Sequence, residues 1–245
     1  MAIIRGNDDD NRINGTSAAD SLYGMSGDDT IYGYDGNDLV DGGEGNDRLD
    51  AGSGSNRVLG RSGNDQIWAG NGTDTIDAGE GNDDVRAGNG HNSITLGSGN
   101  DRSWSGNGRD TINAGEGNDI VYAGGGWDVL IGGEGDDLLS GQGGADRITA
   151  ADGNDTLNGG TGNDTMTGGE GADDFYFNGG VDRITDFENG DDEIDVSYYA
   201  RFDSYADIRA AASQSGSDVV IRAGTDRLVI EGISINQLSS DDFNW

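Results

Sequence analysis

An acidic residue or its amide recurs at every ninth position from Asn11 to Asp182, and an apolar residue almost always follows two positions later. Cut into nines from Gly6, the chain gives twenty consecutive units that end at Thr185 without an insertion. The sixth place is Asp in seventeen units and Asn in three, and the fourth is Gly in eighteen. The eighth is apolar in every unit except the one that carries Ser103. A fixed short period of this kind predicts a solenoid, in which each unit is stabilised by stacking on its neighbours.

The composition agrees with a repeat array and sets a condition on its folding. The chain has 47 Gly and no Pro, and the glycines recur at fixed places, which indicates a backbone with positive φ or close approach. The formal net charge is −33, from 47 acids and 14 bases, and only 32% of the residues are hydrophobic. A chain of this composition is expected to be disordered as long as its charge is not neutralised.

Each nine-residue unit is expected to contain one turn and one short strand. Places one to six are predicted to form the turn and places seven to nine the strand, with the eighth side chain pointing inward and its two neighbours outward. Two units then complete one turn of eighteen residues, so that alternate units stack along the same rim. We call the rim that carries Asp29 to Asp173 the first rim, and the rim that carries Asp20 to Asp182 the second rim.

The units resemble the repeats of a known family over about three quarters of the chain. Gly-Gly-Glu-Gly-Asn-Asp-Arg-Leu-Asp at 42–50 and Gly-Gly-Thr-Gly-Asn-Asp-Thr-Met-Thr at 159–167 are similar to the RTX (repeats-in-toxin) haemolysin-type calcium-binding repeats, including those of mannuronan C5-epimerases and serralysin-type proteases. The resemblance implies an all-β, right-handed parallel β-roll with two repeats per turn and a small C-terminal cap of strands and a short helix. It also implies Ca²⁺, held between stacked turns by sixth-place carboxylates and the carbonyls of the Gly-rich loops, since calcium prefers oxygen ligands.

By this resemblance the metal ligands are the sixth-place Asp residues and the loop glycines, for about a dozen to eighteen ions. The first-rim carboxylates are those of Asp29, Asp47, Asp65, Asp83, Asp101, Asp119, Asp137, Asp155 and Asp173. The second-rim carboxylates are those of Asp20, Asp38, Asp74, Asp110, Asp128, Asp146, Asp164 and Asp182. The glycines are Gly45, Gly63, Gly81, Gly99, Gly117, Gly135, Gly153 and Gly162. Asn56 and Asn92 each remove a ligand charge from the second rim, so we expect weaker or missing ions beside them.

The two ends of the array are expected to be caps, because open solenoid turns expose unpaired backbone and apolar core. Residues 1–5 are predicted to form an N-terminal capping strand, residues 6–185 the calcium-binding β-roll, and residues 186–245 a C-terminal cap with a type I secretion signal. Within the last segment, Ser204 to Asp207 resembles a capping box that opens a short helix to about Ala212. Val219–Arg222 and Arg227–Ile230 are predicted to form a hairpin.

The sequence favours a non-catalytic protein. It lacks a His-Glu-x-x-His motif, and its single histidine, His91, excludes a multi-histidine zinc centre. It lacks Cys and Lys, which excludes thiolate, P-loop and Schiff-base chemistry, and it lacks a Gly-x-Ser-x-Gly elbow. Paired carboxylates are typical of glycosidases, but here they recur with the repeat, so the calcium-ligand interpretation is preferred. The repeats begin at Gly6, so we expect no catalytic domain before them.

An outer face of the roll offers an alternative function. Arginine and aromatic residues recur there at outward places, and a regular row of them suits an anionic, alginate-like polysaccharide. These residues are Arg48, Trp68, Arg86, Arg102, Trp104 and Tyr122. The simpler interpretation is that they only cover the strand surface.

We therefore predict a secreted, extracellular protein whose calcium binding is coupled to folding, with a structural, surface or export role. The start of the chain lacks the features of a secretory signal peptide, and no apolar run is long enough to cross a membrane. Its expected partners are calcium ions, the type I secretion machinery by resemblance, and the polysaccharide of the alternative. Nucleic acid is disfavoured because the net charge repels phosphate.

Overall fold

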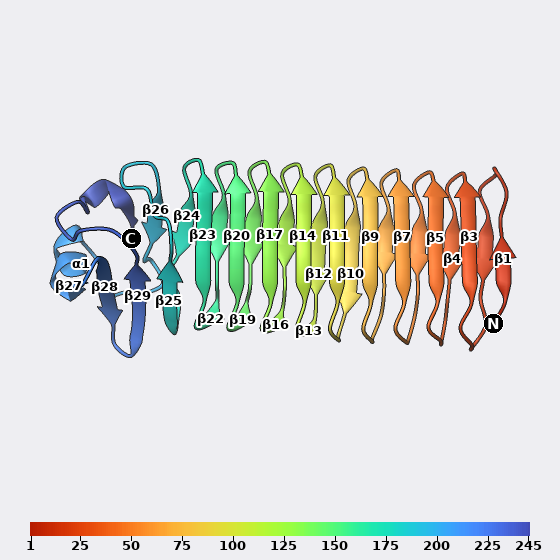
Figure 1. The fold of residues 1–245 in the computed structure, drawn as a ribbon, viewed down its shortest axis with the longest axis horizontal. Helices are drawn as coiled ribbons and strands as arrows, with labels where there is room; N and C mark the ends of the chain where they lie inside the picture. The colour runs from red at the N-terminus through yellow and green to blue at the C-terminus, as the bar shows by residue number, and fades with distance from the viewer.

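The computed structural model describes residues 1–245, and most of them wind into a parallel β-solenoid of about 11 turns. Figure 1 shows the turns in series along the long axis, from β1 at the N-terminal end to a cap at the C-terminal end. Through most of the repeats each strand pairs in parallel with the strand eighteen residues later, so that Leu22 pairs with Val40 and Val40 with Val58. The register follows from the period, since two nine-residue units return each place to the same side. The parallel β-roll with two repeats per turn is confirmed.

One wall of the solenoid is a 14-stranded sheet. Most of its strands are six residues long and run from the seventh place of one unit to the third place of the next. In spatial order they are β1 (Ile3–Arg5), β3 (Ser21–Ser26), β5 (Leu39–Glu44), β7 (Arg57–Ser62), β9 (Thr75–Glu80), β11 (Ser93–Ser98), β14 (Thr111–Glu116), β17 (Val129–Glu134), β20 (Arg147–Asp152), β23 (Thr165–Glu170), β25 (Val181–Ile184), β29 (Asp226–Ile230), β28 (Asp218–Ala223) and β27 (Ala212–Ser215).

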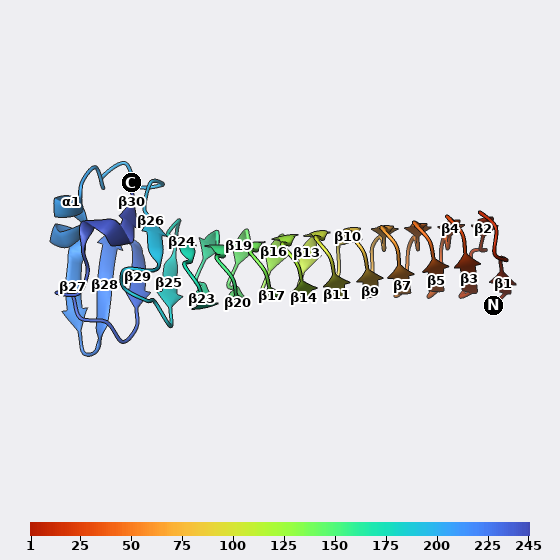
Figure 2. The ribbon, with the colours of Figure 1, turned by 90° about the horizontal axis from the view of Figure 1, so that it is seen from above.

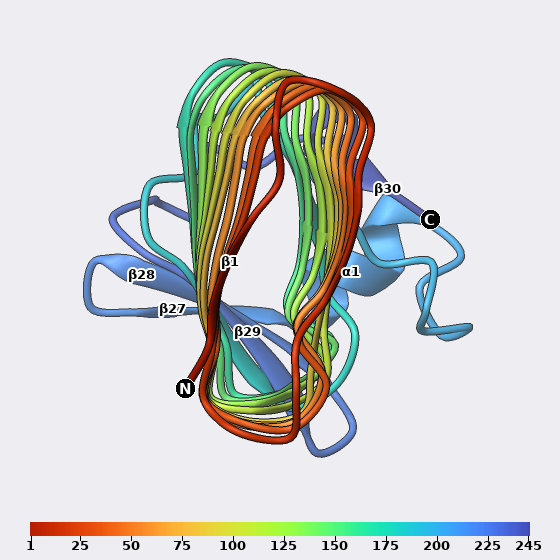
Figure 3. The same cartoon turned by 90° about the vertical axis from the view of Figure 1, so that its right-hand side faces the viewer.

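The opposite wall is a 12-stranded sheet, and Figure 3 shows the two walls facing each other when the solenoid is viewed along its axis. Its strands are mostly three residues long, at places seven to nine. In spatial order they are β2 (Arg12–Asn14), β4 (Thr30–Tyr32), β6 (Arg48–Asp50), β8 (Gln66–Trp68), β10 (Asp84–Gly88), β12 (Arg102–Ser105), β15 (Ile120–Tyr122), β18 (Leu138–Ser140), β21 (Thr156–Asn158), β24 (Asp174–Tyr176), β26 (Glu193–Asp195) and β30 (Phe243–Asn244).

The two rims have turns of different length, so the expectation of one turn-and-strand pattern for every unit is wrong for half of the units. On the first rim the turn takes only places four to six, because places one to three continue the long strands. On the second rim it takes places one to six. Part of this longer turn forms a third, four-stranded sheet of β13 (Asn107–Gly108), β16 (Gly125–Gly126), β19 (Gly143–Gly144) and β22 (Thr161–Gly162).

The core is the space between the walls, and the eighth-place side chains fill it. Ile31, Leu49 and Val85 are fully buried, as the alternation of strand side chains predicts. Ser103 occupies the same place and is also fully buried, and its hydroxyl lacks a hydrogen-bond partner. The layer between Val85 and Val121 therefore contains a polar group where every other layer is apolar.

The C-terminal cap continues both walls past Thr185. β29 pairs with β25, and β26 and β30 follow β24. The predicted hairpin is confirmed as β28 and β29, and Figure 2 shows it beyond the last turns together with the α-helix α1 (Tyr205–Ala211). The short 3-10 helix η1 (Ser240–Asp242) precedes β30. None of the helices has the length and apolar character needed to cross a membrane.

The predicted helix is present, but the predicted capping box is not formed. Ser204 is the N-cap residue of α1, yet its side chain makes no capping hydrogen bond to the helix backbone. Its hydroxyl is instead 2.6 Å from Asp207 Oδ2. A capping box does form at Ser239 and Asp242, in a segment for which no element was predicted.

Candidate metal centres along the two rims

The sixth-place Asp residues lie where the chain turns at each rim, and all seventeen are buried although their side chains are acidic. None is more than 3% exposed. The turns hold them there because the following strand begins at the next residue, except at Asp182, which lies inside β25, and the eighth-place side chain of that strand is buried in the core. The structure thus brings the sequence-predicted carboxylates into two rows, one along each rim.

One carboxylate oxygen of each Asp belongs to a hydrogen-bond ladder along its rim. The backbone N–H of Asp47 donates to Asp65 Oδ1 at 2.7 Å, and the N–H of Asp65 donates to Asp83 Oδ1 at 2.7 Å. The same bond repeats every eighteen residues on both rims. These bonds to a charged acceptor fix the orientation of each carboxylate and use one of its oxygens.

The other oxygen, Oδ2, is buried and has no hydrogen-bond partner at sixteen of the seventeen positions. A buried carboxylate oxygen without a partner is costly, so a repeated set of them indicates a group that binds there. Asp20 is the exception, since its Oδ2 accepts hydrogen bonds from the backbone and hydroxyl of Thr16. The sixteen belong to Asp29, Asp38, Asp47, Asp65, Asp74, Asp83, Asp101, Asp110, Asp119, Asp128, Asp137, Asp146, Asp155, Asp164, Asp173 and Asp182.

Asn56 shows which atoms face the position of Asp Oδ2, because its amide nitrogen Nδ2 takes that position. Its Nδ2 lies 3.1 Å from the carbonyl oxygen of Ala69, 3.4 Å from that of Gly54 and 3.5 Å from that of Gly52. Ala69 holds the first place of the unit that stacks on the unit of Asn56. Gly54 and Gly52 hold the fourth and second places of the unit of Asn56 itself. In a unit with Asp at the sixth place, the carbonyl oxygens of the equivalent residues lie opposite a carboxylate oxygen. Neither kind of oxygen carries a hydrogen, so they cannot form a hydrogen bond.

Gly24 illustrates the same convergence in an Asp unit. A Cβ placed on Gly24 would lie 2.2 Å from Asp29 Oδ2 and 2.3 Å from the carbonyl oxygen of Gly42, which is the first place of the stacked unit. The carboxylate and the carbonyl therefore border one small space. Two oxygen acceptors that face each other in this way are stabilised by a cation.

The fourth-place glycines are required by the stacking of the loops. Gly63 has a φ of +117°, and a Cβ on it would lie 2.0 Å from the carbonyl oxygen of Gly45 in the preceding turn. Positive φ is shared by all eight glycines that the sequence assigned to the metal sites: Gly45, Gly63, Gly81, Gly99, Gly117, Gly135, Gly153 and Gly162. Their conformation turns the loop. Gly54 is the fourth-place glycine of another unit, and its carbonyl oxygen faces the sixth-place side chain of Asn56.

Burial raises the pKa of most sixth-place carboxyl groups. Desolvation is the main cause for Asp65, whose pKa rises to about 8, with further increases from the stacked Asp83 and Asp47. The pKa of Asp137 and that of Asp146 rise to about 7 for the same reason. Hydrogen bonds from backbone N–H groups oppose these shifts. Asp20 differs, since hydrogen bonds from Ala2 and Thr16 lower its pKa. Stacked carboxylates therefore require either protons or a counter-charge near neutral pH.

The donor set fits calcium. Carboxylate and carbonyl oxygens are hard ligands, and calcium takes about six to eight of them in flexible geometry. No three acidic, His or Cys side chains converge on one point, so most ligands at each centre must be backbone carbonyls. The residues that would hold an ion are the sixth-place Asp together with residues at the first, second and fourth places of adjoining units.

Two acidic residues beyond the repeats extend the first rim and were missed by sequence reasoning. The N–H of Asp173 donates to Asp192 Oδ1 at 3.0 Å, so the ladder continues after a spacing of nineteen residues instead of eighteen. Asp186 accepts hydrogen bonds from the N–H groups of Gly168 and Gly169, each at 3.0 Å. A search for the period with one inserted residue would have found Asp192.

The arginine and aromatic residues of the outer face contact one another. Arg86 lies over Trp68 at 5.7 Å and over Trp104 at 5.1 Å from the ring centroids, and Arg48 lies 4.1 Å from the centroid of Trp68. Trp104 also stacks on Tyr122. Arg102 is exposed on β12, beside these residues. The guanidinium groups thus already occupy ring faces that a sugar would need.

Comparison with known proteins identifies the repeat. The family model described as the RTX calcium-binding nonapeptide repeat (4 copies) matches nine overlapping segments, at residues 5–40, 14–49, 50–85, 68–103, 77–112, 96–126, 104–139, 122–157 and 149–184. A comparison with curated proteins gives no match.

Two solved structures are similar to the chain. One is the solution structure of a subunit of the Azotobacter vinelandii mannuronan C5-epimerase, with 31% identity, a TM-score of 0.40, and coverage of 47% of this chain and 76% of that chain. The other is the crystal structure of an extracellular lipase from Serratia marcescens, with 16% identity, a TM-score of 0.33, and coverage of 80% of this chain and 45% of that chain. The chain therefore spans less than half of the lipase.

Proposed function

The chain belongs to the family of RTX calcium-binding nonapeptide repeats and binds calcium, and we propose that this binding is what folds the roll. The observation that carries the proposal is the two rows of buried carboxylate oxygens without partners, sixteen in all, several of which border the same space as a backbone carbonyl at each rim. Without a counter-charge, each would cost desolvation energy and would repel its stacked neighbours. Metal binding is then part of the folding free energy.

The chain's own residues prepare each centre. The Oδ1 ladder orients the carboxylate, the fourth-place glycine brings the loops of successive turns into contact, and the eighth-place residue anchors the turn to the core. A bound calcium ion supplies the positive charge that joins Oδ2 to the facing carbonyls. We propose sites at all the sixth-place Asp residues and the eight loop glycines named above, and about a dozen to eighteen ions in all.

We propose a non-catalytic role, as a calcium-folded structural, surface or export protein. The recurrence and burial of the paired carboxylates support this, because the ladder uses one oxygen of each and the other faces carbonyls. No specific observation favours the polysaccharide alternative, since Arg86 and Arg48 already cover the faces of Trp68 and Trp104.

We further propose that residues 1–5, 6–185 and 186–245 act as N-terminal strand, calcium-binding roll and C-terminal cap. By family resemblance, the last segment also serves type I secretion to the cell exterior. A chain that needs calcium to fold would remain unfolded at low cytosolic calcium and fold outside the cell. Full-length chain should accumulate in the medium of cells that have a type I exporter and stay inside cells that lack it. Equal release from both would reject this part of the proposal.

Calorimetric titration of the chelated full-length chain with calcium tests the proposed function. We expect saturation at about a dozen ions or more, together with a gain of β-structure by circular dichroism. Asp83→Asn should lower the number of bound ions, whereas Asp84→Asn should leave it unchanged. Asp84 is the matched control because it is the next residue but forms an ion pair with Arg86 on the outer face. Absence of binding, or an equal loss in both variants, would contradict the proposal.

A further inference from the structure

Two asparagines, Asn56 and Asn92, interrupt the row of carboxylates on the second rim. Both occupy the sixth place, and both are 3% exposed, as deeply buried as the Asp residues around them. Neither has a side-chain atom without a hydrogen-bond partner, in contrast to the sixteen Asp residues with a buried, unpartnered Oδ2. The difference comes from the amide group, which has a donor where the carboxylate has an acceptor.

The amide oxygen keeps the place of Asp Oδ1 in the ladder. Asn56 Oδ1 accepts the N–H of Asp38 at 3.0 Å, and Asn92 Oδ1 accepts that of Asp74 at 3.1 Å. The bonds to Asp acceptors next to them on the same rim are shorter, at 2.7 Å from Asp20 to Asp38 and from Asn56 to Asp74. A neutral acceptor makes a longer and weaker bond than a charged one, but the stacking register is preserved.

The amide nitrogen faces carbonyl oxygens. Nδ2 of Asn56 donates toward Ala69, Gly54 and Gly52, and Nδ2 of Asn92 donates to the carbonyl of Gly88 at 3.3 Å. Gly88 holds the second place of its unit, as Gly52 does. The N–H groups therefore point into the space in which Asp units have only oxygens.

Asn11 shows that this arrangement depends on position and not on residue type alone. It is the sixth-place residue of the first unit, and its Nδ2 donates to the side chain of Asn7 at 2.7 Å. Its Oδ1 accepts the N–H of Asn7 at 2.7 Å, within the same unit. Only the two internal asparagines direct their amide hydrogens at loop carbonyls.

We propose that Asn56 and Asn92 are amide-filled positions, at which side-chain N–H groups hold the carbonyls that calcium holds elsewhere. The inference rests on the proposed function. A cation at these positions would face an N–H dipole and would lack a ligand charge, so the two loops remain metal-free. The second rim consequently binds calcium in three separate runs, and its turns at residues 52–56 and 88–92 keep their loop contacts down to lower free calcium than the Asp turns do.

Native mass spectrometry of the full-length chain at saturating calcium tests the inference by counting ions. Asn56→Asp and Asn92→Asp should each add one ion, and the double variant should add two. Asn64→Asp is the matched control, since it adds the same charge at the exposed fifth place of the first rim. The chain already has an acidic residue at that place in Asp28, whose Oδ1 accepts the N–H of Asn46 at 2.7 Å. The control should add no ion.

The outcomes separate the inference from the function on which it rests. If the unsubstituted chain binds calcium but the Asp variants add no more ions than the control, the inference is wrong and the function stands. If the unsubstituted chain binds no calcium, both are wrong. Hydrogen exchange gives a second readout: as free calcium is lowered, residues 52–56 should lose protection at higher free calcium in Asn56→Asp than in the unsubstituted chain, and equal midpoints would overturn the inference.

Discussion

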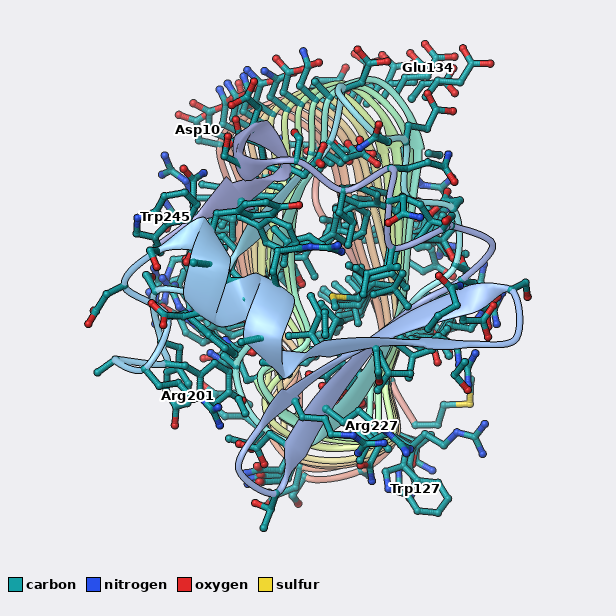
Figure 4. All side chains as sticks on the ribbon, turned by 90° about the vertical axis from the view of Figure 1, so that its left-hand side faces the viewer. Asp10, Trp127, Glu134, Arg201, Arg227 and Trp245 are labelled. Carbon is teal, nitrogen blue, oxygen red and sulfur yellow. The ribbon has the colours of Figure 1, made fainter.

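The two rims carry the same sixth-place pattern but are built differently. The first rim has short turns at places four to six, an unbroken row of Asp, and a second ladder in which the fifth-place Asn46, Asn64 and Asn82 accept N–H groups from the next turn. The second rim has turns twice as long, two asparagines in its row, and varied fifth-place residues that accept such bonds only at some turns, as His91 Nδ1 does from the N–H of Arg109 at 2.7 Å. Figure 4 shows Asp10 and Glu134 at one rim and Trp127 at the opposite one.

The contrast shows that the same loop carbonyls are satisfied in two ways. At the first rim the partner of the carbonyls must come from outside the chain, since every internal sixth-place side chain is an acid. At Asn56 and Asn92 the chain supplies the partner itself. The first rim should therefore depend on calcium throughout, and the second rim less so at two turns.

Partial removal of calcium should give the largest difference between the rims. As free calcium falls, the ladder amides of Asp47, Asp65 and Asp83 should lose hydrogen-exchange protection by about 100-fold or more, because their acceptor carboxylates become uncompensated. Amides of the turns near Asn56 and Asn92 should lose protection at lower free calcium. Peptide-resolved exchange mass spectrometry measures this, and identical midpoints at both rims would contradict the comparison.

Acid should partly replace calcium at both rims, with the largest single contribution from Asp65 on the first rim. A carboxyl group whose folded pKa exceeds its unfolded value stabilises the fold fully below the unfolded pKa, and this contribution is lost as pH rises through the folded pKa. For Asp65 this stabilisation is lost between pH 3.8 and about 8, and for Asp137 it is lost between pH 3.8 and about 7. In chelator, β-structure measured by circular dichroism should increase from pH 8 to pH 5. A signal that stays constant or falls over this range would reject the prediction.

Removal of single carboxylates should affect the rims unequally. Asp83→Ala lies within the unbroken row and removes both a ladder acceptor and an ion from a continuous series, so it should cost about 3 kcal/mol in calcium. Asp74→Ala lies between Asn56 and Asn92, where fewer neighbouring ions depend on it, and should cost roughly half as much. Denaturant unfolding at fixed calcium compares the two variants. Equal losses would indicate that the asparagines do not divide the second rim.

Ser103→Val should give the smallest effect on stability, and it tests whether the core can change without a change in metal binding at the rims. The hydroxyl is buried without a partner, and the stacked residues on either side are Val85 and Val121. Replacement should raise the free energy of unfolding by about 1 to 2 kcal/mol without changing the number of bound ions. Thermal unfolding and ion counting check the two parts. A changed ion count would show that the core and the rims are not independent.

The period, together with the family resemblance, was enough to predict the parallel register, the buried eighth place and the two rows of carboxylates. These features follow from geometry that every unit shares. The difference in turn length was not predictable, because a nine-residue template treats both halves of a turn alike, whereas the long strands begin after the second-rim turns and continue into places one to three of the next unit. Similarly, one extra residue hid Asp192 from a strict eighteen-residue search.

Side-chain partnerships were the least predictable part. The sequence placed Trp68, Arg86 and Trp104 on one face, but it did not reveal that Arg86 lies between the two rings. It likewise placed Ser204 and Asp207 at a helix start, where the two side chains bond to each other instead of to the backbone. Such choices depend on distances between side chains, which residue spacing does not determine.

The most direct measurement is far-ultraviolet circular dichroism of the full-length chain at neutral pH, first in excess chelator and then along a calcium titration. If carboxylate rows at both rims must be neutralised before the turns can stack, the chelated chain should show little β-structure and gain it cooperatively as calcium is added. A chelated chain that shows the full β-spectrum at neutral pH, unchanged by calcium, would contradict the coupling of metal binding to folding.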